Sequence, residues 1–288
     1  MESPFFRLLG GILVEPIPTW KGRPDEMPVP RLIACDVDGT LLSLGQTQLN
    51  PSTIELIKRL REAGIVFAPA SGRQRPSLRR LFTPVSNSLP AVAENGTIVT
   101  VDDEVIFRAT MERALGDEII CAILARDECE ALVSGVEVSY LQPKTPEFTE
   151  LLRDAIKYKI VLVDDATAIP EPYSKIAVYH PDAETEQKYW QQRFGSRCTV
   201  AVSGITWIDL MPLGISKATG LKALCTHLGI DPADCLALGD ADNDIEMLDF
   251  AGDSVAMEHG SAQAKAHAKR TARTADDVFR QILAELDA

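Results

Sequence analysis

Short, unbroken apolar runs and helical repeats alternate in the first and last parts of the chain. Unbroken apolar character is typical of strands that a parallel sheet buries on both faces. The runs cover residues 31–36, 65–70, 90–96, 235–240 and 253–257. Apolar residues at helical spacing lie at 50–64, 215–229, 243–252 and 276–286. This order of strands and helices predicts a doubly wound, Rossmann-like α/β core with a parallel sheet.

The middle of the chain has a different pattern. Runs rich in β-branched and aromatic residues, such as VIFRATM and YSKIAVYH, predict strands with helical repeats between them. We therefore expect a separate α+β module inserted into the core. The first residues, whose apolar run is broken by Arg7 and Glu15, are interpreted as an extension rather than a signal peptide. The expected division is an N-terminal extension at 1–30, a core at 31–97 and 206–288, and the inserted module at 98–205.

Composition and charge exclude several classes of function. The chain of 288 residues has 29 Lys and Arg against 42 Asp and Glu, a net charge of −13. This balance argues against a nucleic-acid-binding protein and against docking on an anionic membrane, because both depend on clustered basic residues. No apolar stretch reaches about 20 residues, so no membrane-spanning helix is expected. Six scattered cysteines without C-x-x-C spacing indicate reduced thiols in a cytoplasmic protein.

Two acidic turns follow apolar strands of the predicted sheet. Asp36 and Asp38 lie in DVDGT after the first run, and Asp240 and Asp244 lie in GDADND after a later one. The carboxyl ends of parallel strands meet at one edge of a sheet, so the turns would lie together. Clustered carboxylates repel one another unless a cation or a proton holds them, and oxygen ligands with room for water favour Mg²⁺. Either turn by itself could also be a solvated acidic loop.

Two further residues are ambiguous when each is taken alone. Ser71, in ASGR after the second run, could bind phosphate oxygens or belong to an ordinary loop. Lys217, in GISKATG at the start of a helix, could be a surface residue. Together with the acidic turns they assemble phosphoryl-transfer chemistry. A carboxylate attacks phosphorus, Mg²⁺ and a lysine neutralise the phosphoryl oxygens, and a second aspartate moves the proton.

The motifs DVDGTLL, ASGR, GISKATGL and GDADNDIEML resemble, in order and spacing, the four motifs of the haloacid dehalogenase superfamily. They are similar in particular to those of the Cof-like phosphatases with a large α/β cap. ENGTIV at 94–99 matches the element where that branch passes from its core to its cap. The resemblance covers about residues 31–288 and implies that the inserted module is a cap domain that closes over the core cleft.

The resemblance also implies a role for each matching residue. Asp36 would be the nucleophile and a Mg²⁺ ligand, Asp38 the general acid/base and a ligand through its carbonyl oxygen, and Asp240 a further ligand. Lys217 would be a catalytic residue that binds phosphate and steadies Asp36, and Asp244 would stand behind the metal ligands. The residues implied for substrate binding are Ser71, Gly72, Arg73 and Asn243.

These residues predict a Mg²⁺-dependent phosphatase that hydrolyses a small phosphorylated metabolite, by the family's theme a sugar phosphate, through an aspartyl-phosphate intermediate. One alternative is a phosphomutase or phosphotransferase with the same chemistry, and another is a catalytically weak regulatory relative. The expected partner is a small phosphomonoester, with neither nucleic acid nor membrane. The loop at 257–260 (MEHG) departs from the family pattern and receives no role.

Overall fold

The computed structural model describes residues 7–9, 12–14, 29–43 and 45–287. Most of the expected N-terminal extension, residues 1–30, lies outside these described residues. The part of the extension that is described includes two short antiparallel strands, β1 (Arg7–Leu9) and β2 (Ile12–Val14). The account of the fold that follows begins at the first strand of the core.

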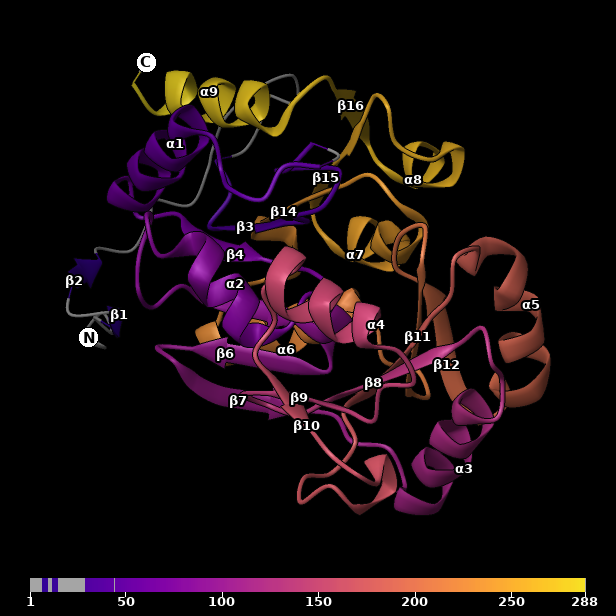
Figure 1. The fold of residues 1–288 in the computed structure, drawn as a ribbon. Helices are drawn as coiled ribbons and strands as arrows, with labels where there is room; N and C mark the ends of the chain where they lie inside the picture. Colours follow the sequence, from indigo (N-terminus) through magenta and orange to yellow (C-terminus); the bar gives the residue numbers. More distant parts are fainter. Residues whose placement is uncertain (1–6, 10–11, 15–28, 44, 288) are drawn as a thin grey trace.

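Five parallel strands from both ends of the chain form the central sheet. In order across the sheet they are β16 (Arg270–Ala272), β15 (Asp253–Met257), β14 (Cys235–Gly239), β3 (Leu32–Cys35) and β4 (Val66–Pro69). Strand β3 pairs directly with β14, so indigo and gold strands lie side by side in Figure 1. This arrangement confirms the predicted α/β fold with a parallel sheet.

Helices cover both faces of this sheet, because successive side chains of a strand point to opposite faces. In β3, Ile33 and Cys35 pack into the hydrophobic cluster of α1, α2 and α9, whereas Leu32 and Ala34 pack into that of α6, α7 and α8. All four side chains are fully buried, as an unbroken apolar run requires. The helices are α1 (Pro51–Glu62), α2 (Arg75–Phe82), α6 (Lys217–Leu228), α7 (Ile245–Phe250), α8 (Ala262–His267) and α9 (Ala275–Leu286).

A second, six-stranded sheet forms the cap, and only its β9–β10 pair is parallel. Its strands in order are β10 (Ile160–Leu162), β9 (Ser139–Leu141), β8 (Glu130–Ser134), β11 (Lys175–Tyr179), β13 (Trp207–Pro212) and β12 (Cys198–Val202). Helices α3 (Arg113–Leu124) and α5 (Ala183–Phe194) pack on one face. Helix α4 (Pro146–Glu150) and the π-helical turn Leu151–Ala155 pack on part of the other face.

The strand pairing differs from the expected domain boundaries at two places. Strand β13, expected in the core, pairs with β11 and β12 in the cap sheet. Strands β6 (Ile98–Val101) and β7 (Glu104–Arg108), expected in the inserted module, join β5 (Ala91–Ala93) in an antiparallel sheet that contacts α6. The third apolar run forms β5, which is also linked to the edge of the parallel sheet by a parallel bridge between Ala70 and Val92. We propose cap boundaries near residues 109 and 213.

Alternation along the cap strands decides which side chains face the core. In β11, Ile176 and Val178 belong to the cluster with α3 and α5, whereas Ala177 belongs to the opposite face with α4. In β13, Ile208 packs with α3 and α5 and Trp207 lies on the opposite face. Because β13 follows the same two-residue period, the cap sheet has one face covered by α3 and α5 and an opposite face that α4 covers only in part.

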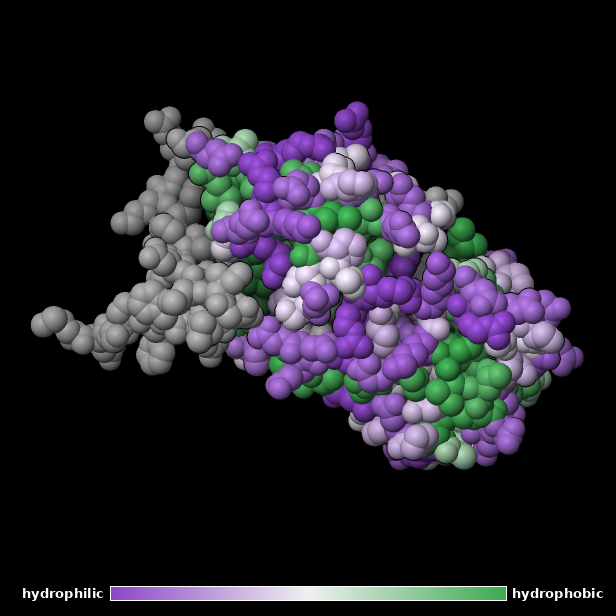
Figure 2. Space-filling model, turned by 60° about the vertical axis from the view of Figure 1, so that its left-hand side comes forward, coloured by the Kyte–Doolittle hydropathy of each residue, from purple (hydrophilic) through white to green (hydrophobic). Residues whose placement is uncertain are grey.

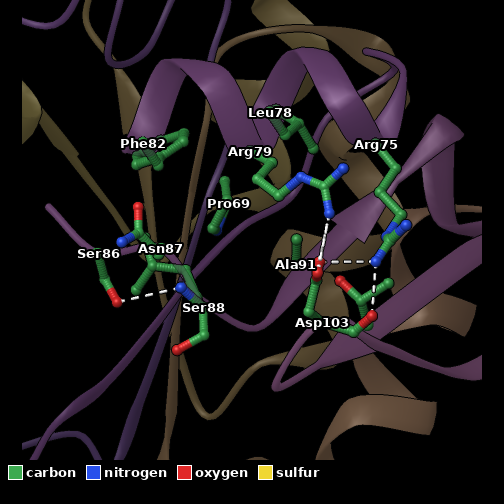
Figure 3. A pocket seen from close by; sticks show the side chains of 12 residues that line it. Pro69, Arg75, Leu78, Arg79, Phe82, Ser86, Asn87, Ser88, Ala91 and Asp103 are labelled. Atoms are coloured by element: carbon green, nitrogen blue, oxygen red, sulfur yellow. Dashed lines mark hydrogen bonds and ion pairs between the residues drawn. The ribbon is translucent and has the colours of Figure 1, made fainter. Parts of the chain in front are cut away.

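Two of the four arginines that follow Ser71 pair with acids of neighbouring loops. Arg75 and Arg79 both bind Asp103, and both also pair with Glu137. Figure 3 shows Arg75 and Arg79 of α2 converging on Asp103 beside a recess with room for little more than a water molecule, about 20 Å³. The pairs with Asp103 fasten α2 to the β6–β7 turn.

The surface matches the composition of the chain. On the face shown in Figure 2, hydrophilic side chains predominate and the apolar ones form smaller patches. Within the described residues, no helix has both the length and the apolar character needed to cross a bilayer.

Candidate active site

The acidic turns and the serine loop meet at the carboxyl edge of the core sheet. Asp36 follows β3, Ser71 follows β4, and Asp240 follows β14. The order of strands reverses between β3 and β14, because β4 lies on one side of β3 and the last three strands lie on the other. Such a reversal opens a crevice beyond the strand ends, which is where doubly wound sheets bind ligands.

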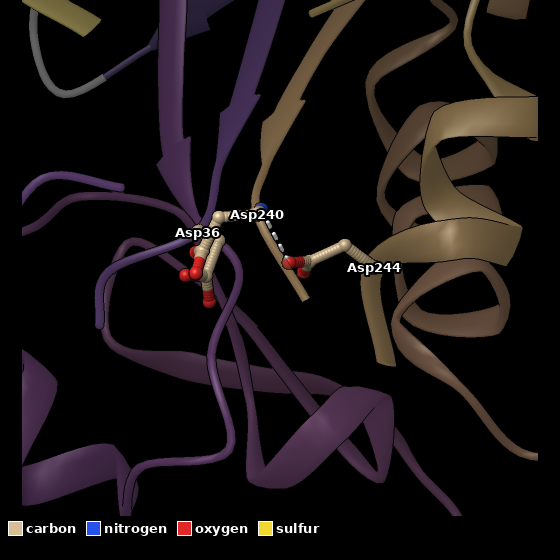
Figure 4. Close-up of side chains that lie close together, drawn as sticks. All are labelled: Asp36, Asp240 and Asp244. Atoms are coloured by element: carbon tan, nitrogen blue, oxygen red, sulfur yellow. Dashed lines mark hydrogen bonds between the residues drawn. The ribbon is translucent and has the colours of Figure 1, made fainter. Parts of the chain in front are cut away.

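Three carboxylates converge in this crevice. Ligand oxygens of Asp36, Asp240 and Asp244 all lie within 4.8 Å of one another. Figure 4 shows Asp36 and Asp240 projecting together from neighbouring strands while Asp244 approaches from the start of α7. The Lys217 Nζ lies 2.6 Å from an oxygen of Asp36 and 2.6 Å from one of Asp244, so it links the first strand to the acidic loop.

Burial makes the charged forms of these carboxylates unfavourable. Burial raises the pKa of Asp36 well above its ordinary value of 3.8, even though Lys217 opposes the rise. Burial also raises the pKa of Asp240, with the negative charge of Asp244 acting in the same direction. Burial alone would lower the pKa of Lys217, but the two carboxylates raise it above its ordinary value. Three carboxylates with one ammonium leave an excess of negative charge, which a divalent cation would relieve.

Both carboxylate oxygens of Asp244 already accept hydrogen bonds from other groups of the protein. Its Oδ2 accepts hydrogen bonds of 3.0 Å from the backbone N–H groups of Asp240 and Ala241, and its Oδ1 accepts one from Lys217. These contacts shape the acidic loop and point Asp240 toward Asp36. Asp244 thus supports the loop from behind, whereas Asp36 and Asp240 present oxygens to the crevice.

Gly39 lets the two acidic turns approach each other. Its φ of +96° lies in a region that side-chain-bearing residues rarely adopt. A Cβ atom there would come within 2.2 Å of the Asp240 carboxylate. The Thr40 hydroxyl then donates a 2.8 Å hydrogen bond to Asp240. The glycine of DVDGT therefore allows the two acidic turns to lie close together, and the threonine holds the Asp240 carboxylate.

Asp38 and Arg73 form a bidentate ion pair at the mouth of the crevice. The Arg73 Nε and Nη2 donate to the two Asp38 oxygens at 2.7 and 2.6 Å. Arg73 was expected to bind substrate, and here its guanidinium holds the Asp38 carboxylate in one orientation. The Arg73 backbone N–H also donates to the Ser71 hydroxyl at 3.2 Å.

A cavity of about 380 Å³ lies between the crevice and the cap. Its core side holds every expected site residue except Lys217 and Asp244, which lie just behind Asp36. Its cap side holds the ends of several cap strands. The core residues lining it are Asp36, Asp38, Ser71, Gly72, Arg73, Asp240 and Asn243.

Comparison with known proteins agrees with this geometry. The family model described as haloacid dehalogenase-like hydrolase matches residues 33–281. The chain belongs to the haloacid dehalogenase-like hydrolases. A solved sugar phosphatase of haloacid dehalogenase subclass IIB, BT4131, superposes with a TM-score of 0.73 over 89% of this chain and 98% of that one. At 19% identity this likeness supports the fold.

Two enzyme relatives indicate the type of reaction for this haloacid dehalogenase-like hydrolase. The chain is 30% identical to 5-amino-6-(5-phospho-D-ribitylamino)uracil phosphatase YbjI of Escherichia coli K12, over 83% of this chain and 89% of the relative. It is also 30% identical to an HMP-PP phosphatase of Enterobacter sp. strain 638, over 81% and 86%. The protein is a phosphoric monoester hydrolase.

Sequence reasoning missed a buried polar network beside this haloacid dehalogenase-like site. The Lys175 Nζ lies 2.7 Å from Glu94 and 3.3 Å from Asp209, and it donates to the Gly72 carbonyl at 2.8 Å. Asn95, at φ 54°, donates to Asp209 at 2.6 Å and accepts from Asn243. A charged residue inside an apolar strand, as in WIDLMP, is the one signal that could have revealed it.

The loop at 257–260 also contacts the site. The His259 ring nitrogen Nε2 lies 2.7 Å from the carbonyl oxygen of Gly39. The backbone N–H of Ser261 donates to the carbonyl of Asp240 at 2.7 Å. A Cβ at Gly260 would lie 2.6 Å from that same carbonyl oxygen. This loop therefore braces both acidic turns even though its sequence departs from the family pattern.

Proposed function

We propose that this phosphatase is a Mg²⁺-dependent enzyme that hydrolyses a small sugar phosphate or related phosphorylated metabolite through an aspartyl-phosphate intermediate. The observation that carries the proposal is the convergence of Asp36, Asp240 and Lys217 in one buried crevice. The name of the Escherichia coli relative, which acts on a phosphorylated ribityl compound, supports a sugar or polyol phosphate. Six free thiols suit a reducing compartment such as the cytoplasm.

The residues present fit a magnesium ion. Asp36 and Asp240 offer carboxylate oxygens within 4.8 Å of each other, and all the available donors are oxygens. The ligands would be Asp36, Asp240 and the backbone carbonyl of Asp38, with Asp244 fixing the loop behind them. When bound, Mg²⁺ would neutralise charge on the phosphoryl oxygens and orient the group for attack.

Asp36 is the proposed nucleophile. One of its oxygens bonds to phosphorus as the bond from phosphorus to the leaving oxygen breaks, which leaves the phosphoryl group on the carboxylate. The Lys217 ammonium, 2.6 Å from Asp36, holds this side chain and adds positive charge next to the phosphoryl oxygens. The Ser71 hydroxyl, held by the Arg73 N–H, is placed to donate to a phosphoryl oxygen.

Asp38 is the proposed general acid and base. It gives its proton to the leaving oxygen in the first step and takes a proton from the attacking water in the second. Water then displaces the Asp36 carboxylate from phosphorus and releases inorganic phosphate. In the ionised form that takes the proton from water, the Asp38 carboxylate is oriented by its bidentate pair with Arg73, so Arg73 acts through Asp38, while Gly72 and Asn243 line the phosphate side.

The proposal is tested by phosphate release from p-nitrophenyl phosphate with Mg²⁺ and with EDTA. We expect turnover with Mg²⁺ and its loss with EDTA. Stoichiometric free phosphate from sugar phosphates supports a hydrolase, whereas transfer to an added sugar hydroxyl would support the phosphotransferase alternative. Metal-independent turnover, or none across a broad panel of phosphomonoesters, would contradict the proposal and support a regulatory protein.

A further inference from the structure

The wall of the active-site cavity that faces the crevice comes from the cap and combines apolar side chains with the polar residues Lys175, Ser203 and Asp209. Five of its side chains carry hydrocarbon or aromatic surface, and they come from β8, the segment after the π-helical turn, β11 and β13. They are Leu132, Ile156, Tyr158, Ala177 and Trp207. Any leaving group attached to a phosphoryl group at Asp36 would have to occupy the space beside these residues.

Of the two aromatic side chains of this wall, Trp207 is held in place by neighbouring rings. The Trp207 ring centroid lies 5.1 Å from that of Tyr179 and 6.2 Å from that of Phe148. Burial raises the pKa of Tyr158 to about 12, so its phenol is uncharged at neutral pH. A rigid, uncharged aromatic surface loses little conformational entropy when a planar ring packs against it.

Both cations among the described residues that line the cavity, Arg73 and Lys175, are already paired. The Arg73 guanidinium is bidentate on Asp38. Lys175 is buried between Glu94 and Asp209, and its third hydrogen bond goes to the Gly72 carbonyl. Among the described residues lining the cavity, carboxylates outnumber these two cations. A second anionic group on the leaving side would therefore enter without an unpaired cation to receive it.

We propose that this cavity selects monophosphate esters whose leaving group is uncharged and carries a planar ring beyond the sugar or polyol, with Tyr158 and Trp207 as the specificity-determining residues. This inference rests on the proposed phosphatase function. The volume of about 380 Å³ lies within the range of small-molecule sites and accommodates a ring in addition to a pentose. A bare triose or pentose phosphate would leave the aromatic wall uncovered.

Two matched pairs of substrates test the proposal with the full-length protein and Mg²⁺. Uridine 5′-monophosphate and ribose 5-phosphate differ by one planar ring. We expect kcat/KM to be about tenfold higher for the nucleotide, the lower part of the range that stacking of a base on an aromatic side chain provides. Fructose 6-phosphate and fructose 1,6-bisphosphate differ by one anionic group, and we expect kcat/KM to be about tenfold lower for the bisphosphate.

Substitutions at Tyr158 test whether the aromatic side chains of the cap wall cause the preference for a planar ring. Tyr158→Leu should reduce the ratio of the two kcat/KM values, nucleotide over ribose 5-phosphate, and Tyr158→Phe should keep it because the ring remains. The matched control is Tyr189→Leu, which removes a cap tyrosine that packs on Trp190 and Arg126 outside the cavity. It should leave the ratio unchanged.

The outcomes separate this inference from the proposed function. Absence of Mg²⁺-dependent turnover with every ester, p-nitrophenyl phosphate included, would overturn the phosphatase mechanism. Mg²⁺-dependent turnover with equal kcat/KM for the nucleotide and ribose 5-phosphate would overturn only the ring preference. Preference for the bisphosphate would overturn the assignment of an uncharged leaving group. An equal fall of the ratio in Tyr158→Phe and Tyr158→Leu would show that the phenol hydroxyl, and not the ring, makes the distinction.

Discussion

Replacing Lys175 by methionine should destabilise the protein far more than loss of an ordinary ion pair. The Lys175 ammonium and the carboxylates of Glu94 and Asp209 are each 5% exposed or less. Burial alone would lower the pKa of Lys175, but Asp209 and Glu94 raise it above its ordinary value of 10.5, so the ammonium is charged at neutral pH. Methionine fills a similar volume and removes the charge, which leaves two buried carboxylates without their cation.

The magnitude follows from what remains unpaired. Glu94 would lose its 2.7 Å partner, and its other oxygen, Oε1, already has no hydrogen-bond partner within the described part of the chain. Gly72 would lose a donor to its carbonyl. Removing one partner of a buried pair costs about 3–5 kcal/mol. For a chain of this size, that corresponds to a fall in melting temperature on the order of 10 °C.

The assay is urea unfolding at neutral pH with Arg197→Met as the control. Arg197 pairs with Glu118 at 2.7 Å, but both side chains are nearly half exposed, so this loss should cost about 0–1 kcal/mol. A loss below about 1 kcal/mol for Lys175→Met, equal to that of the control, would refute the reasoning.

Acidification provides an independent check on the same variant. Burial raises the pKa of Glu94 above its ordinary value of 4.5 even beside Lys175. Without the ammonium this carboxyl binds a proton more readily still, and a protonated carboxyl needs no cation. A group whose folded pKa is raised favours the folded state at low pH and loses that contribution as pH rises. The difference in stability between Lys175→Met and the wild type should therefore shrink from about pH 8 to about pH 5.

Three further outcomes are expected. Asp36→Asn should lower kcat by at least about 10³-fold without lowering the melting temperature, because burial raises the pKa of this carboxyl and asparagine removes its charge; near-wild-type phosphate release would exclude Asp36 as nucleophile. Beryllium fluoride with Mg²⁺ should raise the melting temperature, and no shift at saturation would argue against a preformed phosphoryl site. A maleimide should label Cys121 in the native protein and the other five cysteines only after denaturation; early labelling of a second thiol, measured by mass, would contradict their burial.

Sequence alone was sufficient for four of the five strands of the parallel sheet, all but β16, and for the position of the acidic turns. An unbroken apolar run such as that of β3 must be buried on both faces, so its place inside a parallel sheet follows from the run itself. Asp36 and Asp240 each follow such a run, and parallel strands end at a common edge. Their convergence in the structure therefore depends on local signals that the sequence displays directly.

Local signals in the sequence do not identify which strands pair with one another. The segment that becomes β13 is compatible with either sheet, because its alternating apolar and polar residues indicate only that one face of the strand is apolar. Its pairing with β11 and β12 places residues 207–212 in the cap sheet, in contrast to the expected boundary. The same limitation applies to β6 and β7, since a two-residue turn predicts a hairpin without predicting what the hairpin packs against.

What the sequence determined by itself was the fold class, the family and the set of residues at the strand ends, because each depends on neighbouring residues in the chain. Only the tertiary structure decided that Arg73 holds Asp38 and that Lys175 lies between Glu94 and Asp209. Glu94 begins the 3-10 turn after β5 whereas Asp209 lies in β13 of the cap sheet, far away in the chain. A buried charge is tolerated only where folding brings its partner beside it, and no local pattern specifies that distance.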